Sequence, residues 1–405
     1  MLKGKTILLG VSGSIAAYKA ASLVSLLVKN SADVHVIMTR NAVNFINPIT
    51  FETLTGNRCL TDTFDRNFEF KVGHVSLAKK ADLLMIAPAT ANVIAKISNG
   101  LCDDMLTTTF LACRCPKLIA PAMNTAMWEN AVTQDNIKKC SQYGMRIISP
   151  AEGHLACGDT GAGKMAEPEV LFRWIVSEAG YKKDLSGKRI LVTAGPTRES
   201  LDPVRFISNH SSGKMGYALA QVAAYRGADV VLVSGPVSLA EPEGVRTVRV
   251  ETAAQMFDAV KEYAPGSDII IKAAAVADYA PLNVSGQKIK KSDGDISVTL
   301  RRTDDILAYL GGHKRDGQII CGFSMETENL IENSRAKLVR KNADMIVANN
   351  LTVPGAGFCG DTNVVTIITK NAQAELPLMT KNQVADKILD AALDLHAGRG
   401  MGGDK

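Results

Sequence analysis

The chain has 405 residues, of which 46% are hydrophobic and 21% charged, and its formal net charge is +5 at pH 7. This is the ordinary composition of a globular protein, and the length predicts two or three domains. No stretch approaches the roughly 18 continuous apolar residues of a membrane span, and the apolar run at residues 7–9 is too brief for a secretory signal. We therefore expect a soluble, cytoplasmic protein. Its basic residues are scattered, which suits anionic small molecules and argues against membrane or nucleic-acid partners.

Eight cysteines lie at positions 59, 102, 113, 115, 140, 157, 321 and 359. They form no Cys-x-x-Cys pair, and the isolated Cys113-x-Cys115 has no second pair or histidine cluster that would complete a zinc site. We expect reduced thiols, most of them buried as small hydrophobic side chains.

The two halves of the chain open with the same pattern. Residues 2–9 read Leu-Lys-Gly-Lys-Thr-Ile-Leu-Leu, and residues 185–192 read Leu-Ser-Gly-Lys-Arg-Ile-Leu-Val. A glycine-containing turn follows each run, and then come a helix-like stretch and a second apolar run, at residues 32–37 and 228–233. This predicts a strand–helix–strand unit used twice, in domains 1–184 and 185–405 that join at a polar linker near residues 181–184.

Further short apolar runs separate helix-like segments, as strands of a buried parallel sheet do. They lie at residues 81–87, 117–121, 268–274, 319–323 and 344–348. We expect two doubly wound, Rossmann-like α/β domains with mostly parallel sheets. The second opening unit is 13 residues longer than the first (43 positions from Leu185 to Ala228 against 30 from Leu2 to Ala32). We place this insertion between Arg198 and Gly213, at the sheet edge where ligands bind, and expect residues 398–405 to be disordered.

The first turn, Gly10–Ser14, is suited to hold a phosphate, because glycine permits close backbone approach and a helix N-terminus follows. The second strand ends Met38-Thr39-Arg40, without the carboxylate that would bind a ribose hydroxyl, so NAD is disfavoured. NADP held through Arg40 stays open. The hydroxyls of Ser12, Ser14 and Thr39 suit the terminal phosphate of FMN.

Three later loops of the first half carry side chains that could take part in chemistry. His74 is placed beside a helix N-terminus, and Asn124 directly follows an expected strand. Cys157 lies in the glycine-dense stretch 153–165, which is typical of a flap over a site. Each of these residues alone is as often structural as catalytic, and their occurrence around one sheet edge favours a site.

The motifs of both halves resemble known enzyme families. Gly-Val-Ser-Gly-Ser-Ile-Ala-Ala-Tyr-Lys (10–19), Ala-Pro-Ala-Thr-Ala-Asn (87–92), Pro-Ala-Met-Asn (121–124) and Ala-Cys-Gly-Asp-Thr-Gly (156–161) are similar to flavin-dependent cysteine decarboxylases. Leu-Asp-Pro-Val-Arg (201–205), Ile-Ser-Asn-His-Ser-Ser-Gly-Lys-Met-Gly (207–216), Ala-Ala-Val-Ala-Asp-Tyr (274–279) and Lys-Ile-Lys-Lys (288–291) are similar to CTP-using phosphopantothenate–cysteine ligases. In this order the chain resembles the bifunctional decarboxylase/ligase family of coenzyme A biosynthesis.

For the first half, the resemblance implies an FMN-dependent decarboxylation of phosphopantothenoylcysteine. Oxidation of the thiol side to a thioaldehyde would absorb the electrons left by the departing carboxylate, and reduction would complete phosphopantetheine. It implies that His74 acts as base or charge-orienting group, Asn124 binds substrate and Cys157 donates a proton. The implied FMN-binding residues are Gly13, Ser14, Thr39, Thr90 and Asn92.

For the second half, the resemblance implies that CTP activates the phosphopantothenate carboxylate as an acyl-cytidylate, with magnesium assisting and cysteine as the attacking amine. Lys288 would neutralise the triphosphate, Asn209 would orient the acyl group or the cysteine, and Asp278 would hold the metal. The implied nucleotide-binding residues are Ala273, Ala274, Ala275, Asp278, Lys288, Asp305, Ile306, Phe323, Lys337 and Lys341. The family also implies trimeric packing of the first domain and dimeric pairing of the second, within a dodecamer.

The chain departs from the family at two places. Lys164 stands where arginine is commoner, and Arg302-Thr-Asp-Asp-Ile-Leu replaces a commoner Lys-Asn-Pro-Asp-Ile-Leu, which leaves the roles of Thr303 and Asp304 open. Two other functions remain: an NADP-dependent oxidoreductase with tandem Rossmann domains, and a non-enzymatic flavoprotein regulator. The presence of both His74 and Cys157 argues against the regulator.

Overall fold

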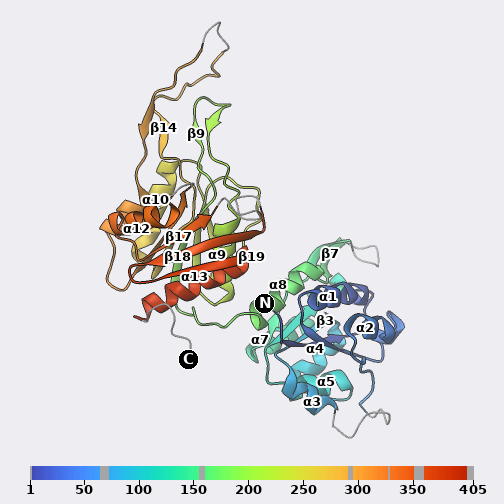
Figure 1. The fold of residues 1–405 in the computed structure, drawn as a ribbon. Helices are drawn as coiled ribbons and strands as arrows, with labels where there is room; N and C mark the ends of the chain where they lie inside the picture. The colour runs from blue at the N-terminus through green and yellow to red at the C-terminus, as the bar shows by residue number, and fades with distance from the viewer. Residues whose placement is uncertain are drawn as a thin grey trace. The chain divides into compact units, whose positions relative to one another are not determined.

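The computed structural model describes residues 2–63, 73–154, 160–290, 295–326, 329–350 and 360–398. The chain divides into two compact units, Met1–Lys182 and Lys183–Lys405 (Figure 1). The end of the expected linker is attached to the second unit. Lys183 Nζ donates to the carbonyl oxygen of Tyr225 at 2.8 Å, and the Asp184 carboxylate pairs with Arg226.

Unit 1 is built on a five-stranded sheet with the order β2-β1-β3-β4-β5, in which every pair is parallel. The central strands are buried along their whole length, because their apolar runs are covered on both faces. The strands are β1 (Thr6–Val11), β2 (Asp33–Met38), β3 (Leu83–Ala89), β4 (Lys117–Pro121) and β5 (Arg146–Ile147).

Helices cover both faces of this sheet. One layer consists of α1 (Ala17–Lys29), α2 (Pro48–Thr55) and α8 (Pro168–Ala179). The other consists of α3 (Gly73–Lys80), α4 (Ala91–Ser98), α5 (Met105–Ala112) and α7 (Ala131–Gln142), whose apolar side chains form one core with the sheet. The short α6 (Thr125–Glu129) follows β4. His74 lies inside α3 and not before it, since the helix begins at Gly73.

The glycine-dense stretch of unit 1 forms an antiparallel hairpin of β6 (Ala151–His154) and β7 (Thr160–Lys164). The glycine content of this stretch predicted a flap over a site and gave no indication of strands. The pattern that predicts strands, alternation of apolar and polar side chains, is missing from residues 160–164 (Thr-Gly-Ala-Gly-Lys).

Unit 2 has an eight-stranded sheet with the order β12-β11-β8-β13-β16-β17-β18-β19. The first six strands are parallel, and β18 and β19 are added antiparallel at one edge. The strands are β8 (Arg189–Ala194), β11 (Asp229–Ser234), β12 (Val245–Arg249), β13 (Ile269–Lys272), β16 (Ile319–Glu326), β17 (Met345–Asn350), β18 (Thr362–Thr369) and β19 (Gln373–Thr380).

The helices of unit 2 again form two layers. On one face lie α9 (Lys214–Tyr225) and α13 (Lys381–His396), which pack against each other. On the other lie α10 (Ala253–Tyr263), α11 (Ile306–Gly312) and α12 (Leu330–Arg340), which share a core with the sheet. The predicted doubly wound α/β class with mostly parallel sheets is confirmed. The antiparallel edge formed by β18 and β19 was not predicted.

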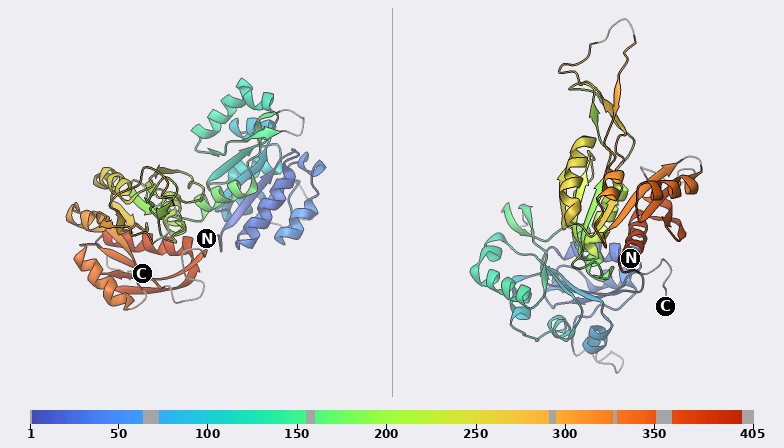
Figure 2. Two further views of the ribbon diagram at one scale, coloured as in Figure 1. Left: turned by 90° about the horizontal axis from the view of Figure 1, so that it is seen from above. Right: turned by 90° about the vertical axis from the view of Figure 1, so that its left-hand side faces the viewer.

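An arm projects from unit 2 (Figure 2). It contains two small antiparallel pairs, β9 (Glu199–Ser200) with β10 (Phe206–Ile207) and β14 (Tyr279–Pro281) with β15 (Leu300–Arg302). The first pair falls within the insertion that we placed between residues 198 and 213.

Two negative findings apply to the described part of the chain. None of its helices is long and apolar enough to cross a bilayer. Its six cysteines are free thiols. Cys157 and Cys359 lie outside the described residues.

Candidate active sites

In unit 1 the strand order reverses between β1 and β3, and the loops after these two strands meet at the carboxyl edge of the sheet. Crevices at such reversals are the usual ligand sites of doubly wound folds. The Ser12 hydroxyl ties the two loops together: it donates to the carbonyl oxygen of Pro88 at 2.8 Å and accepts from the Thr90 backbone N–H at 3.0 Å. Ser12 is fully buried. Its hydroxyl is therefore occupied within the protein, and our interpretation of Ser12 as a phosphate ligand is corrected.

The other hydroxyl and glycine candidates surround this crevice. A side chain at Gly13 would place its Cβ 2.6 Å from Cβ of Asn41, so only glycine fits between the first loop and the segment after β2. Ser14 Oγ accepts from the Ala16 N–H at 3.3 Å, in the turn that leads into α1. Thr39 follows β2 and is nearly buried, whereas Asn92 is exposed in the first turn of α4.

His74 and Asn124 reach the same edge from different elements. His74 is the second residue of α3, which leads into β3 and therefore begins at the carboxyl edge of the sheet. Asn124 follows β4 and caps α6, its side-chain oxygen accepting from the Met127 N–H at 3.2 Å.

The β6–β7 hairpin is fixed beside Asn124 by two glycines. The Met123 N–H donates to the Gly163 carbonyl oxygen at 3.0 Å, and a Cβ at Gly163 would lie 2.3 Å from the Met123 carbonyl oxygen. A Cβ at Gly161 would lie 2.7 Å from Oγ1 of Thr125. Cys157, in the connection between the two strands, lies outside the described residues.

A buried lysine joins α1 to the chain that leaves this hairpin. Lys19 Nζ donates to the Met165 carbonyl oxygen at 3.0 Å and pairs with Glu167 at 2.9 Å. These contacts, first that with Lys19, hold the pKa of Glu167 below its usual value. Lys164, which replaces the commoner arginine, lies 3.4 Å from the same carboxylate.

In unit 2 the strand order reverses between β8 and β13, and two threonines, one near the end of β8 and one in the loop after it, hold the loop after β13. Thr193 Oγ1 accepts from the Ala274 N–H at 3.1 Å, and Thr197 Oγ1 accepts from the Ala277 N–H at 3.0 Å. Gly195, between them, has φ +77°, which favours glycine, and its carbonyl oxygen accepts from the Ala275 N–H at 3.0 Å. The backbone of residues 273–277 is thus fixed from one side.

Two further side chains complete this support. Asn209 Nδ2 donates to the Ala275 carbonyl oxygen at 2.5 Å, and its Oδ1 accepts from the Ser211 N–H at 3.2 Å. Thr303 Oγ1 donates to the Ala277 carbonyl oxygen at 2.6 Å. In the structure Asn209 and Thr303 position the loop, which gives Thr303 a role that the sequence left open.

Two adjoining cavities open at this edge of unit 2. The first has a volume of about 240 Å³ and is lined by the start of α9, the loop after β13 and the ends of β16 and β17. The second, of about 610 Å³, lies between that loop and α11 and α12. They share Lys272, Val276, Asp278 and Lys337. Of the predicted nucleotide-binding residues, Ala273, Ala274, Ala275 and Phe323 line the first cavity, Asp305, Ile306 and Lys341 the second, and Asp278 and Lys337 both.

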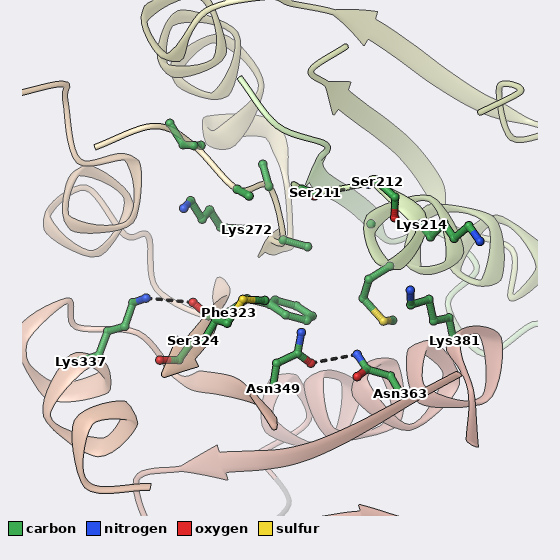
Figure 3. A pocket seen from close by; sticks show the side chains of 18 of the residues that line it. Ser211, Ser212, Lys214, Lys272, Phe323, Ser324, Lys337, Asn349, Asn363 and Lys381 are labelled. Carbon is green, nitrogen blue, oxygen red and sulfur yellow. Dashed lines mark hydrogen bonds between the residues drawn. The ribbon is translucent and has the colours of Figure 1, made fainter. Parts of the chain in front are cut away.

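Four lysines line the first cavity. Lys272 and Lys337 lie toward one end and Lys214 and Lys381 toward the other (Figure 3). Lys337 Nζ donates to the Phe323 carbonyl oxygen at 2.9 Å. Desolvation in the crevice, followed by the nearby charge of Lys337, lowers the pKa of Lys272 to about 8.

The second cavity carries a built-in ion pair. Asp305 caps α11, accepting from the Ala308 N–H at 2.9 Å, and also pairs with Lys341. Desolvation opposes ionisation, but the hydrogen bond from Lys341 still holds the pKa of Asp305 below its usual value. Ile306 is 2% exposed and contributes to the core beneath α11.

Lys288, like Asn209, is a predicted residue of the second site that lines neither cavity in the described structure. It is exposed on the arm, after β14. Its neighbour Ile289 is held at both backbone groups: its N–H donates to Asp202 at 3.1 Å, and its carbonyl oxygen accepts from Arg205 at 2.5 Å. Asp202 is itself buried and accepts from the N–H groups of Val204 and Arg205.

Comparison with known proteins identifies the family. Residues 1–180 match the flavoprotein family, and residues 185–395 match the C-terminal domain of the DNA/pantothenate metabolism flavoproteins. The chain is 47% identical over 406 aligned residues to the coenzyme A biosynthesis bifunctional protein CoaBC of Bacillus subtilis, covering 98% of this chain and 99% of that protein. The chain belongs to this bifunctional family. The CoaBC protein of Escherichia coli is 43% identical and is covered to 97%, with 96% of this chain aligned.

Two solved structures are similar to parts of this family member. The C-terminal domain of a CoaBC protein is 46% identical, covers 54% of this chain and 98% of its own, and has a TM-score of 0.46. A PPC decarboxylase complexed with pantothenoylaminoethenethiol is 32% identical, covers 42% of this chain and 96% of its own, and has a TM-score of 0.39.

Sequence reasoning missed Lys272 and Lys381 among the residues of the bifunctional protein's second site. Lys272 ends an apolar run and reads as a strand terminus, and Lys381 begins a helix more than one hundred residues away. Only the folded sheet brings them to one cavity. No cluster of three acidic, histidine or cysteine side chains suited to a metal occurs among the described residues.

Proposed function

We propose that the two units carry out consecutive steps of coenzyme A synthesis. Unit 2 couples 4′-phosphopantothenate to cysteine, with CTP converted to CMP and pyrophosphate through an acyl-cytidylate. Unit 1 then releases carbon dioxide from 4′-phospho-N-pantothenoylcysteine and yields 4′-phosphopantetheine. The observation that carries the ligase assignment is the pair of cavities at the β8/β13 reversal, where four lysines converge around a rigid loop.

In the ligase step the protein binds and orients charged groups. Ala273, Ala274 and Ala275 present backbone, with small side chains, to a base. The one carboxylate shared by both cavities, Asp278, would hold Mg²⁺, whose remaining ligands come from substrate phosphates and water, as is usual for this ion. The lysines supply the positive charge that a departing pyrophosphate requires. Lys288 would approach from the arm.

In the decarboxylation step the residues present fit FMN. The crevice between β1 and β3 offers the Ser14 and Thr39 hydroxyls, a glycine that admits close approach and the start of α1. FMN, when bound, supplies reversible two-electron acceptance from the thiol side of the substrate. His74 would hold or move a proton, Asn124 would orient the substrate, and Cys157 would return a proton to carbon.

A single preparation of the full chain tests both assignments. We expect a yellow protein with flavin absorbance. It should release pyrophosphate only when CTP, phosphopantothenate and cysteine are all present, and carbon dioxide from supplied phosphopantothenoylcysteine. A colourless protein that oxidises or reduces NADP(H) would overturn the proposal in favour of the oxidoreductase alternative.

The role of Cys157 has a test of its own. Cys157→Ser should keep bound FMN and still release carbon dioxide, but an oxidised, decarboxylated thiol product should accumulate in place of phosphopantetheine. Mass spectrometry of the product distinguishes the two. A normal yield of phosphopantetheine would remove Cys157 from the proton-donor role.

We also propose that the protein acts in the cytoplasm as a homo-oligomer, with trimers of unit 1 and dimers of unit 2 combined in a dodecamer. The mass of the native protein in solution tests this: a monomer would overturn it.

A further inference from the structure

Lys272 is the last residue of β13, at the point where the strand order of unit 2 reverses. It lines both cavities, so its side chain lies at their junction. It is partly buried, and within the described ranges its ammonium group makes no hydrogen bond or ion pair. A charged group that is partly removed from water and lacks a counter-ion is costly to keep.

The charged neighbours of Lys272 do not supply that counter-ion. Lys337 and Lys341, from α12 and the residue after it, lower its pKa, whereas Asp278 and Asp305 oppose them. Asp305 is already paired with Lys341 and caps α11. Asp278 is exposed at the mouth of the cavities.

The other end of the first cavity differs in this respect. Lys214 pairs with Asp361 at 2.7 Å, and Lys381 donates to the Gly360 carbonyl oxygen. Of the four lysines, Lys272 is the one for which the described structure gives no protein partner.

We propose that Lys272 binds the phosphate groups of the nucleotide at the junction of the two cavities. The inference rests on the proposed function of unit 2. The charge of the first cavity favours this ligand: four lysines and one aspartate line it, a net charge of +3 (4 − 1). A triphosphate matches that charge, and the position of Lys272 next to Ala273, Ala274 and Ala275, where the base is proposed to bind, favours the nucleotide over phosphopantothenate, which also carries a phosphate. The ligand supplies the counter-ion that the described residues do not provide.

This assignment separates Lys272 from a structural lysine. A lysine that stabilises the fold loses stability when its charge is removed. A lysine that is placed to bind a ligand lowers the stability of the ligand-free protein and stabilises the complex. Lys272→Met should therefore weaken the nucleotide complex without lowering the melting temperature of the ligand-free protein.

The experiment uses the full chain and three ligands: CTP, inorganic pyrophosphate and cytidine. In calorimetry, Lys272→Met should lower the binding affinity for CTP and for pyrophosphate about 10- to 100-fold, the usual range for a hydrogen bond to a charged group. The affinity for cytidine should stay within about twofold of wild type. Lys272→Arg keeps the charge and should retain most of the affinity. Lys261→Met, an exposed lysine of α10, controls for the loss of one positive charge and should behave as wild type.

The outcomes distinguish this inference from the function beneath it. A wild-type protein that fails to bind CTP overturns both. If the wild type binds CTP and Lys272→Met binds it with the same affinity, only the role of Lys272 is overturned. Three other results would also overturn it: equally weakened binding of cytidine, a lowered melting temperature, or weakened binding of phosphopantothenate with unchanged binding of CTP. They would assign Lys272 to the base, the fold or the acyl substrate, respectively.

Discussion

The two units form their crevices in the same way and differ in the charged side chains around them. In both, hydroxyl side chains at or just after the end of the first strand hold the loop of the neighbouring strand: Ser12 in unit 1, Thr193 and Thr197 in unit 2. In unit 2 the crevice so formed collects four lysines. In unit 1 the nearby Lys19 is instead locked to Glu167. Topology therefore locates a crevice, and the charged side chains that line it favour one class of ligand.

Independence of the two units is tested most strongly at Arg226. This buried residue pairs with Asp184 at 2.9 Å, Asp386 at 3.1 Å and Asp390 at 2.8 Å. Arg226→Met leaves three carboxylates without their cation, which should cost about 3–5 kcal/mol. Hydrogen exchange of the full chain should show lost protection in β8 and β11 and none in β1 and β3.

The exposed Arg246 provides the control for Arg226. It only donates to the Tyr263 hydroxyl at 3.1 Å and lies over that ring, so Arg246→Met should change protection little. Lost protection in β1 and β3 of the Arg226 variant would contradict the independence of the units.

Lys288 separates the two chemistries. Because negative charge grows on the departing pyrophosphate, Lys288→Gln should lower CTP-dependent pyrophosphate release about 10²–10³-fold. Release of carbon dioxide from supplied phosphopantothenoylcysteine should stay near wild type. Lys290→Gln, two residues further along the same exposed segment, should leave both rates unchanged. Equal loss of both activities in Lys288→Gln would indicate a folding defect or a shared site.

The hairpin of unit 1 gives the reverse test. Gly163→Ala places a methyl group 2.3 Å from the Met123 carbonyl oxygen and should displace the hairpin from Asn124, at a cost of about 1–3 kcal/mol. Decarboxylation should fall roughly tenfold or more while ligase activity persists. Gly153 is the matched position, since its φ is +152° against +135° at Gly163, but none of the described residues lies within 4 Å of a Cβ there. If Gly153→Ala lowers decarboxylation equally, backbone strain and not the contact is responsible.

The smallest expected effect is on stability, and it comes from a comparison of two equivalent positions of the internal repeat, Asp33 and Asp229. Burial opposes ionisation of Asp33, but hydrogen bonds from Lys80 and Asn57 lower its pKa to about 2. A carboxyl group whose pKa is lower in the folded state stabilises the protein above pH 4 and loses that contribution between about pH 4 and pH 2. Asp33→Asn should cost less than about 1 kcal/mol at pH 7, because the pair is partly exposed.

Thermal unfolding over pH 3–7 measures this effect. The difference between Asp33→Asn and wild type should shrink as the pH falls. Asp229 is exposed at the start of β11, and its carboxylate makes no hydrogen bond or ion pair within the described residues, so Asp229→Asn should match wild type throughout. A difference that grows on acidification would contradict the assignment.

The sequence predicted what depends on local pattern. The apolar runs at 117–121 and 319–323 predicted β4 and the first part of β16, and the repeated opening predicted two doubly wound units. It did not predict contacts made across long separations. Asp202 meets Ile289 across 87 residues, and Lys272 gains its place only when α11 and α12 pack beside β13. Ser12 was misassigned because a hydroxyl in a glycine turn looks the same whether it faces a ligand or a neighbouring loop.

The insertion at residues 198–213 has a consequence for protein engineering. It is not a detachable loop: Asp202 and Arg205 hold the backbone at Ile289, and Asn209 holds the backbone at Ala275. One continuous segment thus sets the geometry of two others that are distant in the chain. A chimera that exchanges residues 198–213 alone between relatives would combine mismatched partners, whereas one that moves residues 198–213 together with 273–290 would transfer a self-consistent module.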